Sequence, residues 1–344
     1  MDDLDRRLLI LLQQPIPLQR RPFETMAKTV GTDAASLLLR IHRLKETGAI
    51  LSMSAIFDKK SLGYKTSLVL MRIPEALLEK TGKTVAAHPG VWQAYQRPCE
   101  FNLWFAIGVP ARETIEDHVR RLHRLTQAEQ TLILPVLRRY KPVEIDGWEA
   151  GGNGRVVETL PVREKAVMRV LQEEFPLTDE PFKHLAARVE LHESELLHVI
   201  HALQTAGYFK GIQASLHLRS GSAGAGTVVW QIPEEKMDQA GRVLAGSRDI
   251  LTCYQRPCYP AFPYSLFATV KSKGEKDMET LVQEMAERLG AWPHLVLTQA
   301  QAVKKTRLRL FDDKLSEWWE NTDEEGKDAE ASWPEGLQRT YFTG

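Results

Sequence analysis

Apolar residues at helical spacing open the chain and recur near its middle. Leu4, Leu8, Leu11 and Leu12 share one helical face, and two more amphipathic stretches follow. Glycine ends the last helix of each set, because it readily takes the left-handed conformation that closes a helix. The predicted helices are 4–12, 23–30 and 35–46, then 165–174, 181–189 and 193–205, with Gly48 and Gly207 as their stops. Three short helices followed by an extended segment predict a winged helix-turn-helix in each set.

Alternating or continuous apolar runs follow each helical set and predict strands. The expected strands are 50–57, 66–73, 101–109 and 130–136, then 212–217, 227–232, 265–271 and 294–299. Helices are expected between them at 74–88, 111–125, 235–245 and 276–289, and the glycine-rich run 220–226 predicts an extended turn. The resulting order, ββαβαβ, is typical of a ferredoxin-like α+β sandwich, although the pairing of the first two strands stays open.

The two parts of the chain are copies of one another. The pentapeptide YQRPC at 95–99 recurs at 254–258, and the same offset carries Pro22-Phe23 onto Pro181-Phe182. The period is far longer than a solenoid repeat, so each copy is large enough to have its own core. The predicted fold is therefore α+β, a tandem duplication of winged helix-turn-helix plus ferredoxin-like α/β sandwich. The expected boundaries are 1–50 (winged helix-turn-helix), 51–148 (ferredoxin-like), 149–160 (linker), 161–211 (winged helix-turn-helix), 212–310 (ferredoxin-like) and 311–344 (acidic tail with tryptophans).

Composition is that of an ordinary globular protein. The 344 residues include 45 basic and 45 acidic side chains, and no stretch approaches the roughly 20 apolar residues of a membrane helix. The start of the chain lacks a signal-peptide pattern, so we expect a cytoplasmic protein without a membrane partner. The three cysteines lack metal-type spacing and are expected to be reduced thiols.

The charge pattern disfavours DNA as a partner. A helix that reads the major groove needs donors for base edges and cations for phosphates. The second copy of that helix instead begins with Glu193 and Glu195, and the first copy begins with Asp33 and small residues. A net charge of zero gives no long-range attraction to DNA either.

The repeated motif places a tyrosine two positions before an arginine in each half. If the motif is a strand, Tyr95 and Arg97 project to one side, as do Tyr254 and Arg256. An arginine that packs its stem on the sheet and reaches water would explain one such pair. The repetition, together with the flanking segments, favours a functional role.

These segments resemble the siroheme decarboxylases, which share the fold of the Lrp/AsnC regulators. The similarity is carried by 91–97 with Phe101-Asn102-Leu103-Trp104-Phe105, by 251–257 with 262–267, and by 56–58, 62–64 and 228–230. The resemblance implies that two related subunits, fused here in one chain, convert siroheme to didecarboxysiroheme by loss of two acetate carboxyls as carbon dioxide. The product serves d-type haem or alternative haem biosynthesis. It further implies no cofactor beyond the iron of the substrate, and no protein metal site.

Roles for individual residues follow from that chemistry. A macrocycle with many carboxylates needs cations, and Arg97 and Arg256 can hold a carboxylate with two parallel hydrogen bonds. The carbon that loses carbon dioxide must be protonated, and Tyr95 and Tyr254 are the expected donors.

The family pattern also marks further residues. Gln93 and Thr252 stand where the family usually has histidine, and Lys271 stands where a strand commonly ends in histidine. His217 matches a family histidine and is the candidate axial ligand or proton relay. Together with Trp104, these are the predicted substrate-binding residues.

The missing histidines leave alternatives open. The chain is a divergent decarboxylase, a catalytically impaired tetrapyrrole-binding partner, or an Lrp/AsnC-like DNA-binding regulator. Besides siroheme, the expected partners are a second copy of the chain or paralogous decarboxylase subunits. The tail tryptophans are expected to dock on a neighbouring half or subunit.

Overall fold

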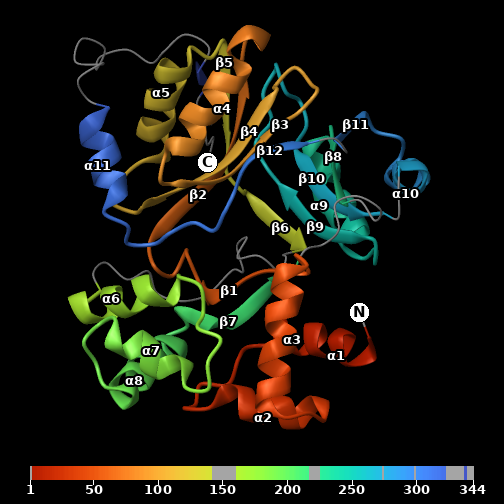
Figure 1. Cartoon of the computed structure of the whole chain (residues 1–344). Coiled ribbons are helices and arrows are strands. Elements are labelled where there is room, and N and C mark those ends of the chain that lie inside the picture. Colours follow the sequence, from red (N-terminus) through yellow and green to blue (C-terminus); the bar gives the residue numbers. More distant parts are fainter. Residues whose placement is uncertain are drawn as a thin grey trace. The chain divides into compact units, whose positions relative to one another are not determined.

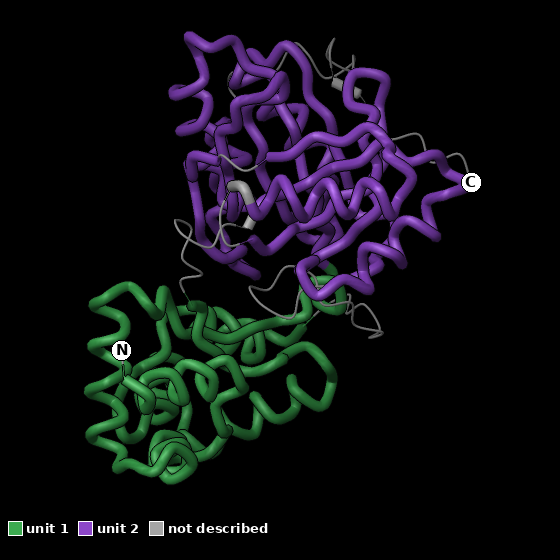
Figure 2. Tube along the Cα trace, turned by 90° about the vertical axis from the view of Figure 1, so that its right-hand side faces the viewer, with its two compact units in different colours: residues 1–63, 144–218 green, residues 64–143, 219–344 purple. Residues whose placement is uncertain are grey.

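Each part of the molecule combines matching pieces from the two halves of the sequence. The computed structural model describes residues 2–141, 160–216, 225–272, 275–297, 300–322 and 337–338. It separates into unit 1, residues 1–63 and 144–218, and unit 2, residues 64–143 and 219–344 (Figure 2). The predicted linker 149–160 lies outside the described residues except for its last position.

Unit 1 holds both helical sets. Its helices are α1 (Asp3–Leu12), α2 (Pro22–Val30), α3 (Ala34–Glu46), α6 (Val162–Leu171), α7 (Pro181–Ala187) and α8 (Glu193–Thr205). The side chains of Asp2 and Asp33 accept backbone N–H groups at the starts of α1 and α3. Gly48 and Gly207 have φ of +72° and +79°, which confirms the predicted left-handed stops.

Unit 1 also contains a two-stranded sheet that crosses between the halves. Strand β1 (Ile50–Phe57) pairs antiparallel with β7 (Phe209–Leu216). Both strands were expected at the start of the ferredoxin-like domains, so that boundary assignment differs from the structure. The physical reason is that each strand finds its backbone partner in its own duplicate, which the pattern of one half does not reveal.

Unit 2 contains two ferredoxin-like domains, which confirms the predicted fold class. The first is built from β2 (Tyr64–Arg72), the short η1 (Glu75–Leu77), α4 (Leu78–Ala87), β3 (Val91–Gln96), β4 (Leu103–Pro110), α5 (Ile115–Thr126) and β5 (Gln130–Leu134). The second is built from β8 (Ala225–Trp230), α9 (Glu234–Ala245), β9 (Ile250–Gln255), β10 (Leu266–Lys271), α10 (Glu275–Leu289) and β11 (His294–Leu297). Helices α4 and α5 pack against the first sheet over a buried apolar core (Figure 1).

The order of strands and helices within each sandwich is βαββαβ, so the expected ββαβαβ was wrong in detail. The expectation counted β1 and β7, which lie in unit 1, and omitted β3 and β9. Those two strands contain polar residues such as Gln93 and Thr252, and their apolar runs are short.

The two sandwiches exchange their final strands. β6 (Arg138–Lys141) pairs with β9 of the second half, and β12 (Gln301–Lys305) pairs with β3 of the first. The sheets therefore run β11-β8-β10-β9-β6 and β12-β3-β4-β2-β5-β13. Two equivalent helix glycines make room for these strands: a Cβ at Gly82 would lie 3.3 Å from Val303, and one at Gly241 only 2.4 Å from Tyr140.

The tail contributes two more elements to unit 2. Helix α11 (Lys314–Asn321) packs beside α5, and β13 (Leu337–Gln338) pairs in parallel with β5. Trp318 joins the edge of the first core, so this tryptophan docks on the first half, whereas Trp333 lies outside the described residues. Within the ranges described, no helix is both long and apolar enough to cross a membrane.

Candidate active site

The two sheets of unit 2 meet through a buried aromatic cluster. Trp104 on β4 lies 5.8 Å from Phe262 and 6.4 Å from Phe267 of the second half, measured between ring centroids. Its indole N–H donates to the carbonyl oxygen of Phe101 over 2.6 Å, so its polar atom is satisfied although the ring is buried. This cluster is the apolar wall beside which both copies of the repeated motif lie.

Arg97 lies against this wall in the first half. Its guanidinium carbon is 5.0 Å from the ring centroid of Trp104 and 6.0 Å from that of Tyr95. Its Nη1 donates to the carbonyl oxygen of Leu297 over 3.2 Å. Burial lowers the pKa of the Arg97 guanidinium from its ordinary value, because removal from water penalises the charged form.

One donor of Arg97 is left for a ligand. Its Nε is buried and has no hydrogen-bond partner within the ranges that the structure describes. A buried cationic donor without a partner is unfavourable, and a carboxylate oxygen is the acceptor that best satisfies it.

The loop that carries Arg97 is fixed by Asn102. The Asn102 side chain accepts from the backbone N–H of Ile73 over 3.0 Å and donates to the carbonyl oxygen of the same residue over 2.8 Å. The Arg97 N–H in turn donates to the Asn102 carbonyl oxygen over 2.9 Å. Asn102, which sequence reasoning quoted only as part of a matched segment, thus positions the motif arginine.

Arg256 repeats the arrangement in the second half. Its guanidinium carbon lies 5.5 Å from the ring centroid of Phe267 and 5.8 Å from that of Tyr254. Its Nη1 donates to the carbonyl oxygen of Leu134, the last residue of β5. The predicted proximity of tyrosine and arginine is therefore present in both copies.

The two copies differ in accessibility. Arg256 is 3% exposed and Tyr254 is 4% exposed, whereas Arg97 and Tyr95 are only partly buried. The hydroxyl of Tyr259 adds a second bond to β5 by donating to the carbonyl oxygen of Ile133 over 2.7 Å. The motif of the second half is closed over the neighbouring sheet, and that of the first half is reachable from outside.

The other predicted site residues that the structure describes are spread over unit 2. Gln93 is half-buried on β3, two positions before Tyr95, so it shares that face. Thr252 is buried on β9 and shares a 2.9 Å hydrogen bond with Thr269. Lys271 is exposed at the end of β10, and His217 lies outside the described residues. Trp104 is thus the predicted substrate-binding residue that the structure places directly beside Arg97.

A separate polar network was missed by sequence reasoning. His88, at the end of α4, and His118, on α5, are buried and face one another. The signal in the sequence is weak: His118 lies on the same helical stripe as Ile115, Val119 and Leu122, and His88 follows the end of α4. In the part of the chain that the structure describes, no group of three or more histidine, cysteine or acidic residues could hold a metal ion.

Comparison with protein families assigns a class to this architecture. Residues 61–141 and 219–304 match the AsnC-like ligand binding domain, and residues 5–50 and 164–209 match the siroheme decarboxylase NirDL-like HTH domain. The chain is a duplicated helix-turn-helix protein with AsnC-like ligand-binding domains. More narrowly, it belongs to the siroheme decarboxylase family, as the predicted resemblance indicated.

Individual relatives match over nearly the whole chain. It is 32% identical to the siroheme decarboxylase of Hydrogenobacter thermophilus, with 91% of this chain and 96% of that protein covered. It is 30% identical to the siroheme decarboxylase NirDL subunit of Paracoccus denitrificans, with 89% and 96% covered. The crystal structure of the siroheme decarboxylase NirDL superposes with a TM-score of 0.76 at 29% identity, over 94% of this chain and 99% of that one. A second crystal structure, equally similar, is that of NirDL in complex with an iron-uroporphyrin III analogue.

Proposed function

We propose that this chain converts siroheme to didecarboxysiroheme by removing two acetate carboxyls as carbon dioxide. The observation that carries the proposal is the buried Nε of Arg97, which lies beside Tyr95 and Trp104 and has no hydrogen-bond partner among the described residues. It occurs in a chain whose relatives are siroheme decarboxylases along almost their full length. The iron-uroporphyrin analogue bound by NirDL is a macrocycle of the same kind.

The chain's own residues divide the work between binding and proton transfer. Arg97 holds a carboxylate of the macrocycle through its free Nε, and the aromatic wall of Trp104 lies against the ring. The reacting acetate loses carbon dioxide, the electrons of the broken carbon–carbon bond stay on the methylene carbon, and a proton from Tyr95 completes a methyl group. A water-poor wall favours this step, because it destabilises the ionised acetate relative to neutral carbon dioxide.

In this proposal the second copy of the motif has a structural role and does not bind substrate. Tyr254 is buried and Arg256 is bonded to β5, so in this proposal Arg256 joins the two sheets and neither residue meets the substrate. Lys271, exposed on β10, is available as an outer anchor for a propionate. No cofactor besides the iron of the substrate is required for a decarboxylation of this form.

Internal ion pairs argue against the alternative of a DNA-binding regulator. On α3, Arg40 contacts both Asp2 and Asp5 at 2.7 Å, and Arg43 contacts Asp5 at 2.6 Å. Two cations of α3 are thus engaged with carboxylates at the start of α1. Salt-dependent binding to duplex DNA, which phosphate contacts produce, is not expected.

Anaerobic incubation with siroheme, followed by mass spectrometry of the tetrapyrrole, tests the proposal. Loss of two carbon dioxide units is expected from the wild-type chain and strongly reduced loss from Arg97→Ala. Arg7→Ala is the matched control, because Arg7 is an exposed arginine on α1 that pairs with Asp3, which is also exposed. Binding of siroheme without any change in its mass would instead identify an impaired partner, whose activity should return on adding paralogous decarboxylase subunits.

A further inference from the structure

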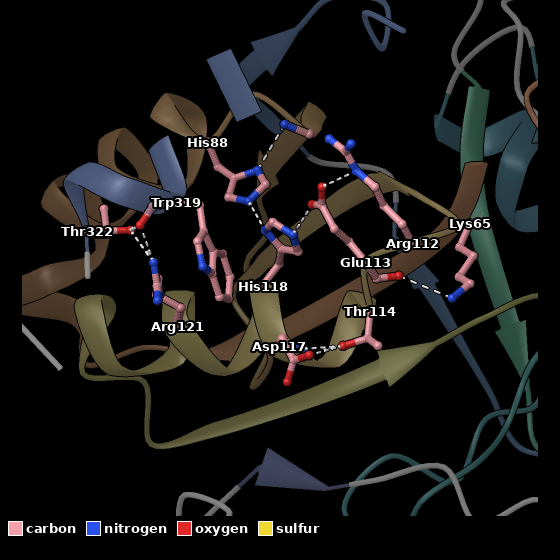
Figure 3. Close-up of polar contacts among 11 residues, drawn as sticks. Lys65, His88, Arg112, Glu113, Thr114, Asp117, His118, Arg121, Trp319 and Thr322 are labelled. Carbon is pink, nitrogen blue, oxygen red and sulfur yellow. Dashed lines mark hydrogen bonds and ion pairs between the residues drawn. The ribbon is translucent and has the colours of Figure 1, made fainter. Parts of the chain in front are cut away.

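A directional chain of hydrogen bonds is buried between α4 and α5 of the first sandwich (Figure 3). The backbone N–H of Gly90 donates to Nδ1 of His88 over 3.0 Å. Nε2 of His88 lies 3.1 Å from Nδ1 of His118, and Nε2 of His118 lies 2.8 Å from a carboxylate oxygen of Glu113. This series of hydrogen bonds runs from the buried turn at Gly90 to the partly exposed carboxylate of Glu113.

The partners at the two ends fix the protons in between. Nδ1 of His88 accepts from Gly90, so its proton must be on Nε2, from which it donates to Nδ1 of His118. The proton of His118 is then on Nε2 and is donated to Glu113. A further proton on either ring would point at an existing N–H group, so both neutral rings are required for the network to persist.

Helix α11 lies directly over these two rings. The Trp318 ring centroid is 4.1 Å from that of His88, and the Trp319 centroid is 4.8 Å from that of His118. Arg121 of α5 donates to the backbone oxygen of Trp319. The guanidinium carbon of Arg121 lies 3.6 Å from the centroid of the Trp319 ring. The two imidazole rings therefore form part of the surface on which α11 docks, and their orientation determines the shape of that surface.

The surroundings of His88 oppose a positive charge. Burial lowers the pKa of His88 well below its ordinary value, and the neighbouring His118 and the ammonium of Lys304 on β12 lower it further. Lys304 is itself held close by donating to the carbonyl oxygens of Ala86 and His88, over 2.7 and 3.2 Å.

His118 has charged neighbours of both signs. Burial is the largest influence and lowers its pKa, while the carboxylates of Glu113 and Asp117 raise it and Arg121 of α5 lowers it. The net direction is downward, as for His88. The indole rings of α11 face the imidazole from the remaining side.

We propose that His88, His118 and Glu113 form an acid-sensitive latch that keeps α11 docked while both imidazoles are neutral and releases it when one is protonated. The rings in the docked state bind protons less tightly than they do once freed, so acid favours release. Docking is complete above the ordinary histidine pKa of 6.5 and weakens as the pH falls below it.

Hydrogen exchange of the full-length chain between pH 8 and pH 5 tests the latch. After correction for the pH dependence of intrinsic exchange, protection of the amides of α11 should fall below pH 6.5 by up to about tenfold per pH unit for each imidazole protonated on release, while that of β4 stays constant. His118→Gln offers an amide that does not titrate and leaves only His88 to take up a proton on release, so its α11 protection should fall less steeply with pH than that of the wild-type chain. His42→Gln, at an exposed position of α3, is the matched control and should behave as wild type.

Nitrogen NMR of the histidine rings gives a second readout that does not depend on the variant folding. At pH 8 both rings should carry their proton on Nε2, and proton uptake should coincide with the loss of α11 protection. Protection of α11 that is constant from pH 8 to pH 5 in the wild-type chain would overturn the latch. So would a protonated Nδ1 on His88 at pH 8, or the same pH dependence in His118→Gln as in wild type.

Discussion

The Nη1 atom of Arg97 lies 3.2 Å from the carbonyl oxygen of Leu297, a residue 200 positions further along the chain. Arg256 bears the same relation to Leu134 of the opposite half. Each repeated arginine therefore joins its own loop to the last sandwich strand of the duplicate. The difference between the copies is that Arg256 is 3% exposed, whereas Arg97 is partly accessible.

Arg256→Ala should destabilise the fold more than it impairs catalysis. It removes a buried cation and leaves the carbonyl oxygen of Leu134 without that donor, which should lower the free energy of unfolding by about 2–4 kcal/mol. Urea unfolding followed by circular dichroism measures the loss.

If the buried Nε of Arg97 binds a substrate carboxylate as proposed, Arg97→Ala should impair catalysis more than it destabilises the fold. Its kcat/KM should fall about 10- to 100-fold, since a hydrogen bond to a charged group contributes roughly 1.5–3 kcal/mol. Equal destabilisation by the two substitutions, with equal loss of rate, would contradict the assignment of separate roles.

Gly241→Ala should disturb the exchange of strands between halves. A Cβ at this position would lie 2.4 Å from the Tyr140 ring of β6, so ring and strand must move, at about 1–3 kcal/mol of unfolding free energy. Gly246→Ala is the matched control at the end of the same helix, because its Cβ would meet no atom closer than 3.5 Å. Urea unfolding of both variants decides whether the contact, rather than loss of a glycine, is responsible.

The duplication made most of the fold predictable, because every pattern could be read twice. Residues 50–57 were assigned as a strand with the bounds that the structure shows, and Gly48 and Gly207 were recognised as helix stops. The exchanged strands β6 and β12 were missed, since they consist largely of basic and polar residues. Their pairing partner is a strand of the other half, and hydrophobic periodicity carries no information about such a partner.

The candidate site was predictable only in part. The repetition together with the flanking segments indicated that Tyr95 and Arg97 belong together, and in the structure the guanidinium carbon of Arg97 lies 6.0 Å from the Tyr95 ring centroid. That Arg256 is closed over Leu134 depends on how the sheets pack. The contact between His88 and His118 joins residues on two helices, and single-residue patterns do not show which buried histidines meet.

The three thiols should differ in reactivity. Burial raises the pKa of Cys253 to about 12, so at pH 8 its thiolate is scarcer than the thiol by about four orders of magnitude, and only the thiolate is nucleophilic. Burial also raises the pKa of the half-buried Cys99, whereas Cys258 is exposed. Timed alkylation with iodoacetamide and peptide mapping should show Cys258 labelled first and Cys253 labelled only after denaturation. Early labelling of Cys253 in the native chain would mean that the core of the second sandwich opens readily.

Gln93→His should raise the rate of decarboxylation. Gln93 is half-buried on β3 and shares a face with Tyr95, so an imidazole there would lie on the side from which the methylene carbon is protonated. A positioned general acid contributes about 10²–10⁴-fold at best, and about tenfold is expected where Tyr95 already acts as donor. Single-turnover rates with siroheme across pH measure the gain, which should appear with a new ionisation near the histidine range.

Thr252→His provides the matched substitution in the other half. Thr252 is buried and hydrogen-bonded to Thr269, so the larger ring should lower the free energy of unfolding without increasing the rate. The pair of variants therefore separates the effect of an added imidazole from the effect of where it is placed. If Thr252→His accelerated the reaction and Gln93→His did not, the second motif would be the working site, and the proposal that Arg97 meets the substrate would fail.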